Sequence, residues 1–179
     1  MVCRSVAVLD LDDTLIVSRR NLNDRDKEMF EPGQYIEYDG MIVLARPYIG
    51  LLLSALKEKF DCIGVWSAGT EEYVARICAW LTEKFNFPFD FIFSRTQCSI
   101  WPSGENSVYV KRLELVAQHL NTRLIDIVLF DDLDLIADIY PGNVHHVAKY
   151  TPYDNLPNSI SDSTLEKITH LVLANHFDA

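Results

Sequence analysis

The segment VAVLDLDDTLIV, residues 6–17, places three carboxylates within four positions between apolar residues. They belong to Asp10, Asp12 and Asp13, and carboxylates without a partner are costly to remove from water. Asp10 and Asp12 are two residues apart, so their side chains start on the same side of an extended chain. One could act as a nucleophile while the other transfers protons, as covalent phosphoryl transfer through an acyl phosphate requires. The alternative is a surface aspartate cluster that caps a turn.

Alternating strands and helices must position these carboxylates. Short apolar runs predict strands, and longer runs with an apolar stripe predict helices. We expect strands at residues 5–11, 62–67, 89–94, 124–130 and 143–150. We expect helices at residues 47–60, 71–85, 108–120, 133–140 and 163–176. This alternation predicts one α/β domain over residues 1–179, with a Rossmann-like, mainly parallel sheet flanked by helices.

Other local signals concern the ends of elements and the connections between them. Residues 16–34 are mostly polar and predict a loop or a short irregular segment. Asp39-Gly40 is a favoured two-residue turn and predicts a small β-hairpin over residues 34–47. Near the end of the chain, Ser163 opens a helix in the pattern of a capping box.

Polar side chains follow three of the predicted strands: Asp10 with Asp12, Ser67, and Asp131 with Asp132. Ligands of such sheets bind outside the carboxyl ends of the strands. If these three ends are neighbours, the carboxylates converge on one point, where a divalent cation would hold them together. Taken singly, Ser67 could be a loop hydroxyl, and the aspartate pair could cap the following helix.

Together, these motif residues resemble those of a known group of enzymes. Asp10-Leu11-Asp12-Asp13-Thr14-Leu15 (the pattern D-x-D-x-T-L), Ser67, Lys111 and Asp131-Asp132 resemble the four motifs of the haloacid dehalogenase superfamily of phosphatases. The segments ARPYIGLLLSAL, VWSAGTEEYV, YVKRLELV and VLFDDL are similar to its NLI-interacting-factor-like branch. That branch includes small phosphatases acting on the RNA polymerase II C-terminal domain. The similarity spans roughly residues 5–175.

The resemblance implies a role for each motif residue. Asp10 would be the nucleophile that forms an aspartyl-phosphate, and Asp12 would protonate the leaving oxygen and then activate water. Ser67 would hydrogen-bond the phosphoryl oxygens, and Lys111 would neutralise the phosphate. The resemblance also implies Mg²⁺, held by Asp10, by the backbone carbonyl of Asp12 and by the aspartate pair Asp131-Asp132. Taken alone, Lys111 could be a solvated helix residue.

Two positions depart from the usual pattern of the branch. Ser67 stands where the branch often has Thr, and Asp132 stands where it often has Asn. Both substitutions keep the needed group, a hydroxyl and an oxygen ligand, so we expect an active enzyme. Adjacent His145 and His146 are unlike a metal site, because neighbouring residues on a strand face opposite ways.

The connections between the motifs bear on the substrate. Superfamily members that act on metabolites often carry a cap domain, and neither gap between the motifs is long enough for one here. An open site suits a phosphorylated side chain on a protein or peptide. Arg19, Arg20, Arg25 and Lys27 could supply a local positive patch, and Trp101 an apolar contact. The alternatives are a small-molecule phosphatase and a catalytically idle protein-binding module.

Charge, hydropathy and cysteine content predict where in the cell the protein acts and which partners it does not bind. The net charge of −10 argues against nonspecific binding to nucleic acid or to anionic membranes. No apolar run is long enough for a transmembrane helix, and the start of the chain does not resemble a signal peptide. The four cysteines are scattered and show no CxxC spacing, so we expect buried free thiols in a reducing compartment. These features predict an intracellular protein, cytoplasmic or nuclear; the oligomeric state cannot be predicted.

Overall fold

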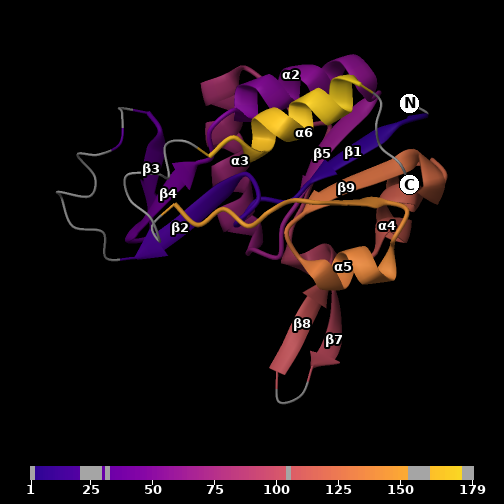
Figure 1. Cartoon of the computed structure of the whole chain (residues 1–179). Helices are drawn as coiled ribbons and strands as arrows, with labels where there is room; N and C mark the ends of the chain where they lie inside the picture. Colours follow the sequence, from indigo (N-terminus) through magenta and orange to yellow (C-terminus); the bar gives the residue numbers. More distant parts are fainter. Residues whose placement is uncertain (1–2, 21–29, 31–32, 104–105, 153–161, 175–179) are drawn as a thin grey trace.

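A five-stranded parallel sheet forms the centre of the protein (Figure 1). The computed structural model describes residues 3–20, 30, 33–103, 106–152 and 162–174. In the order β10-β9-β1-β5-β6, the strands are Val144–His146, Ile127–Asp131, Val6–Leu9, Cys62–Trp66 and Phe91–Phe93. All four neighbouring pairs are parallel. The predicted Rossmann-like α/β fold is therefore confirmed.

Helices cover both faces of this sheet and enclose two hydrophobic cores. The helices are α2 Ile49–Lys59, α3 Glu71–Phe85, α4 Leu113–Leu120, α5 Asp134–Ile139 and α6 Thr164–Leu173. Ala7 and Leu9 of β1 point into the core with α2, α3 and α6, whereas Val6 and Val8 point into the core with α4 and α5. Because β1 is buried on both faces, its sequence is continuously apolar rather than alternating.

Two small antiparallel sheets extend from this body. The first has the order β2-β4-β3, formed by Ile16–Arg20, Met41–Ala45 and Tyr35–Tyr38. Asp39 and Gly40 join β3 to β4 with φ angles of 47° and 69°, as a type I′ turn requires, so the predicted hairpin is confirmed. The expected loop over residues 16–34 is wrong at its start, because β2 pairs with β4 along its whole length.

The second small sheet is a ribbon that projects from the body (Figure 1). It consists of β7 Ser99–Ser103 and β8 Asn106–Val110, which pair with each other. The helix expected over residues 108–120 is therefore too long, since its first residues belong to β8 and α4 begins at Leu113. The β-branched Val108 and Val110, on either side of Tyr109, favour the extended chain.

Two further expectations differ from the structure. Ser163 makes no side-chain cap, and the carboxylate of Asp162 accepts the Thr164 N–H at 2.8 Å instead. Cys3 and Cys62 form a disulfide, so free thiols were the wrong expectation for this pair. The start of β1 pairs with the start of β5, and this long-range register brings the two cysteines together. Cys78 and Cys98 are free.

No helix among the described residues is both long enough and apolar enough to cross a lipid bilayer.

Candidate active site

Three adjacent strands deliver polar side chains to one edge of the central sheet. Asp10 follows β1, Ser67 follows β5, and Asp131 is the last residue of β9. The strands run in the order β9-β1-β5 and are parallel, so their carboxyl ends meet. The backbone N–H of Asp10 donates to the Phe130 carbonyl at 3.0 Å, which fixes the chain just past the end of β1. Sheet topology thus converts distant sequence positions into one cluster.

Lys111 joins two of these carboxylates in the interior. Its Nζ donates to Asp10 Oδ1 and, at 2.6 Å, to Asp131 Oδ2. Lys111 is 2% exposed and Asp131 is fully buried. Burial disfavours the charged ammonium, but the two carboxylates outweigh it and raise the pKa of Lys111. Lys111 therefore remains a cation, held beside the carboxyl group of Asp10.

The acidic side of the cluster carries more charge than Lys111 can balance. Oxygen atoms of Asp10, Asp131 and Asp132 all lie within 4.8 Å of one another. Burial raises the pKa of Asp10 to about 8, opposed by Lys111 and reinforced by Asp131. Burial also raises the pKa of Asp132, again reinforced by Asp131. Three carboxylates facing one ammonium leave a negative excess that a divalent cation with hard oxygen ligands would offset, so the donor set fits such an ion.

The carboxylate of Asp12 makes a separate set of contacts, on the outer side of the cluster. It accepts hydrogen bonds from Tyr73 Oη at 2.6 Å, from Ser67 Oγ at 3.3 Å and from Ser18 Oγ at 3.4 Å. Burial raises the pKa of Asp12, although the hydrogen bonds from Tyr73 and Ser67 oppose the shift. Asp10 and Asp12 thus lie in different surroundings, as two carboxylates with different roles require.

The turn after Asp12 connects this group to Asp132. Asp13 has a φ of 63°, which is uncommon for a residue other than glycine. Its N–H donates to the Ile16 carbonyl at 2.7 Å, and its carboxylate pairs with Lys149 Nζ at 2.7 Å. Thr14 Oγ1 donates to Asp132 Oδ1 at 3.3 Å. The turn therefore fixes the position of Asp12 relative to the acidic cluster.

An open groove leads to the Asp12 side of the site. Its volume is about 710 Å³, and Asp12, Ser18 and Tyr73 form part of its wall. Its other walls carry charged side chains of both signs: Arg20, Asp39, Glu72 and Arg95. The groove lies between the β2-β4-β3 sheet and the start of α3, and Asp12 is reached from this side.

Several residues singled out in the sequence lie elsewhere. His146 Nε2 is 3.1 Å from Asp134 Oδ1, whereas the His145 ring lies against Phe130, so the two histidines have different neighbours. Trp101 is exposed on β7 of the ribbon. Arg25 and Lys27 lie outside the described residues.

Sequence reasoning missed Tyr73 and Ser18. Tyr73 is in the first turn of α3, which begins after the cap residue Thr70, and its ring extends to Asp12. Ser18 lies on β2, the strand that was not expected, and is 2.6 Å from Tyr73 Oη. Neither residue belongs to a recognisable spacing, because both contacts depend on how the small sheet packs beside α3.

Comparisons with known proteins agree with this architecture. A family model described as NLI interacting factor-like phosphatase matches residues 5–176. The chain is 26% identical to CTD phosphatase-like protein 355R of Invertebrate iridescent virus 3, over 92% of this chain and 93% of that protein. Its fold matches the fission yeast RNA polymerase II CTD phosphatase Fcp1 bound to beryllium fluoride, with a TM-score of 0.60 and 16% identity. A second structure of Fcp1, an essential RNA polymerase II CTD phosphatase, also matches with a TM-score of 0.60 and 16% identity.

The matches to the two Fcp1 structures include 96% and 97% of this chain but only 50% of each Fcp1 chain. This chain therefore spans about half the length of Fcp1 in those structures.

Proposed function

This chain belongs to the NLI interacting factor-like phosphatases, and on that basis we propose that it is a Mg²⁺-dependent phosphoprotein phosphatase. Its substrates would be phosphoserine or phosphothreonine in a protein or peptide, hydrolysed through an aspartyl-phosphate on Asp10. One observation carries the proposal: Lys111 contacts Asp10 in a buried acidic cluster, while Asp12 is held separately at the open groove.

In the first half-reaction, a carboxylate oxygen of Asp10 attacks phosphorus, and the bond between phosphorus and the substrate oxygen breaks. Asp12 gives its proton to that leaving oxygen, for which its raised pKa suits it. Lys111 and the Ser67 hydroxyl donate to the phosphoryl oxygens. Ser67 Oγ accepts the Gly69 N–H at 3.0 Å and donates to Asp12 Oδ2 at 3.3 Å, so its proton would turn from Asp12 to a phosphoryl oxygen when the substrate binds.

In the second half-reaction, water replaces the substrate oxygen. Asp12, now ionised, takes a proton from that water, whose oxygen attacks phosphorus and releases the Asp10 carboxylate and inorganic phosphate. Asp12 therefore donates a proton in the first half-reaction and accepts one in the second. Both half-reactions need Asp12 beside the site of the leaving oxygen, and Asp12 lines the groove.

The carboxylates of Asp10, Asp131 and Asp132 and the backbone carbonyl of Asp12 would hold Mg²⁺. The bound ion would offset the repulsion between these carboxylates and the phosphate. Hard oxygen ligands favour Mg²⁺ over zinc.

A protein substrate suits the open groove. The described connections between the motifs hold only the β2-β4-β3 sheet and the β7-β8 ribbon as additions, and we propose one domain over residues 1–179 without a large cap. The walls of the groove carry charges of both signs, which suits the side chains flanking a phosphorylated residue. We propose that the protein acts on such a substrate inside the cell, in the cytoplasm or nucleus, where the Cys3–Cys62 disulfide would be unusual.

A paired screen tests the proposal. Purified protein with Mg²⁺ is given phosphoserine and phosphothreonine peptides, a panel of phosphorylated metabolites and p-nitrophenyl phosphate, with Asp10→Asn as the inactive control. We expect the peptides to give the highest kcat/KM. Preference for a metabolite would identify a small-molecule phosphatase. If the parent protein hydrolyses none of these substrates, it is a binding module rather than an enzyme.

A further inference from the structure

Arg46 is a buried cation outside the catalytic group. It follows β4 directly and is 2% exposed. Its Nη1 donates to the Thr14 carbonyl at 2.9 Å, and its Nη2 donates to the Ala148 carbonyl at 2.8 Å. Nη2 and Nε both donate to Asp162 Oδ2, at 2.9 and 3.2 Å. One guanidinium thus ties together three segments that are far apart in the sequence.

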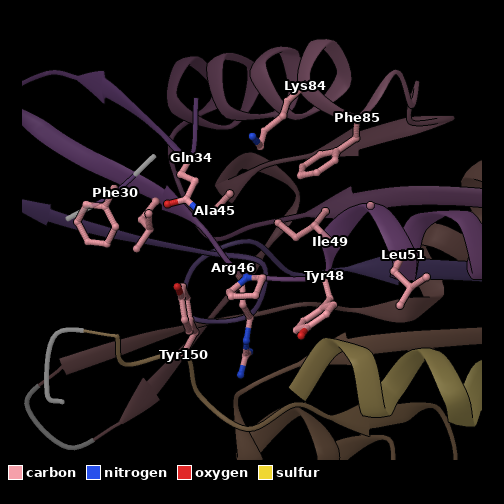
Figure 2. Close-up of a pocket in the computed structure, with 13 residues that line it drawn as sticks. Phe30, Gln34, Ala45, Arg46, Tyr48, Ile49, Leu51, Lys84, Phe85 and Tyr150 are labelled. Atoms are coloured by element: carbon pink, nitrogen blue, oxygen red, sulfur yellow. The ribbon is translucent and has the colours of Figure 1, made fainter. Parts of the chain in front are cut away.

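The bond to Thr14 reaches the turn that follows Asp12. Asp13 in this turn has the left-handed φ of 63°, a conformation that persists only when its surroundings hold it. The Asp13 carbonyl accepts the Tyr150 N–H at 2.7 Å, and the Arg46 guanidinium lies 5.0 Å from the centre of the Tyr150 ring. Figure 2 shows Arg46 and Tyr150 beside each other at a pocket of about 530 Å³. Arg46 therefore holds the Thr14 carbonyl directly and packs against Tyr150, which holds the Asp13 carbonyl.

We propose that Arg46 is a positioning residue that aligns the carboxyl group of Asp12 with the leaving oxygen by holding the turn at Asp13 and Thr14. The inference rests on the proposed function, because it assigns Arg46 to the step in which Asp12 acts as an acid. Three acceptors in different directions require the planar fork of arginine, which lysine cannot reproduce. A displacement of about 1 Å at a reacting group can cost about 10²-fold in rate.

The kinetic test uses R46K and R46Q, with D162N as the matched control. D162N removes the ion pair at the far side of Arg46 but leaves the bonds to Thr14 and Ala148. We expect R46K and R46Q to lower kcat/KM on a phosphoserine peptide by about 10²-fold. The loss of kcat/KM on p-nitrophenyl phosphate should be at least about tenfold smaller, because nitrophenolate leaves without a proton and kcat/KM does not include the later hydrolysis of the aspartyl-phosphate, for which Asp12 acts as base with either substrate. D162N should lower the melting temperature while keeping kcat/KM within about threefold of the parent, a change too small to indicate a displaced acid.

Equal losses of kcat/KM on both substrates, or a loss of kcat/KM in D162N as large as in R46Q, would overturn the assignment, since a purely structural role predicts both. R46K keeps the buried charge and serves for these measurements if R46Q does not fold.

Amide hydrogen exchange supplies a readout independent of activity. The N–H groups of Thr14, Leu15 and Ile16 donate to the Leu11 carbonyl, so exchange in a peptide spanning residues 12–16 reports on the turn. R46K and R46Q should exchange faster there, and D162N should match the parent, at a temperature where all are folded. Unchanged exchange in both Arg46 variants would refute the positioning role. Absence of any phosphatase activity in the parent would refute the proposed function instead.

Discussion

Replacing Asp10 with Asn should stabilise the metal-free protein at neutral pH, although it removes the proposed nucleophile. Burial raises the pKa of Asp10 from 3.8 to about 8 in the folded protein. The folded state then binds a proton that the unfolded state releases, so this group contributes stability below about pH 4 that is lost as the pH rises toward 8. Asparagine has no such proton to lose, and the variant should escape this loss.

The size of the effect follows from the two pKa values. One pH unit of difference corresponds to about 1.4 kcal/mol, so the free energy of unfolding should fall by about 4 kcal/mol between pH 4 and pH 7. The variant recovers only part of this, because an amide at position 10 replaces the carboxyl group that contacts Lys111. We expect a net gain of about half of it, about 2 kcal/mol, at pH 7. For a chain of 179 residues, this corresponds to about 4–8 °C in melting temperature.

Thermal melts in EDTA between pH 5 and pH 8 measure this gain. Other groups also titrate: burial raises the pKa of Asp12 and lowers that of His145, which produce slopes of opposite sign. Subtracting the variant from the parent at each pH isolates Asp10. Asp138→Asn, at an exposed carboxylate, serves as the matched control and should behave like the parent.

Adding Mg²⁺ should stabilise the parent at pH 7 more than the variant, because the ion favours the ionised form of Asp10. A difference in melting temperature between parent and variant that stays constant from pH 5 to pH 8 would contradict the raised pKa of Asp10. A variant that melts below the parent at pH 7 in EDTA would contradict it as well.

Three further predictions concern the reaction. Asp12→Asn should reduce kcat/KM on a phosphoserine peptide by about 10²-fold or more but affect kcat/KM on p-nitrophenyl phosphate less, because only the alkoxide leaving group needs a proton; equal losses of kcat/KM would contradict the acid role. EDTA should abolish activity and Mg²⁺ should restore it, whereas Ca²⁺ should restore little because its bonds are longer and its geometry looser; recovery with zinc alone would exclude the oxygen-ligand site. Reversing the charges of Arg19 and Arg20 should lower kcat/KM for acidic phosphopeptides in a salt-dependent way and leave p-nitrophenyl phosphate nearly unchanged; identical peptide kinetics would exclude a role of these side chains in binding the peptide.

The parts of the fold that follow from local patterns could be predicted from the sequence. Apolar runs ending in polar residues identified β1, β5 and β9, and a parallel sheet requires such ends to meet. The Asp39-Gly40 turn specifies its own hairpin, because only two residues determine the geometry. Family motifs likewise marked the positions of Lys111 and the aspartate pair at Asp131.

Features that depend on long-range packing could not be predicted. β2 contains Ser18, Arg19 and Arg20, and it becomes a strand only because β4 lies beside it. Tyr73 reaches Asp12 because α3 packs near this small sheet, and no spacing in the sequence encodes that contact. The same holds for Arg46, whose partners are distant segments of the chain. Side-chain networks between elements are therefore where the structure adds most to the account of the site.

The central claim is that Asp10 carries the phosphoryl group during turnover. Parent protein and a phosphoserine peptide, mixed with Mg²⁺ and quenched in acid within one turnover, should yield a peptide containing Asp10 with one added phosphoryl group. Hydroxylamine should remove that group, as it does from an acyl phosphate, and Asp10→Asn should show none. A phosphoryl group found on another residue, or turnover without any phosphorylated enzyme, would contradict the account.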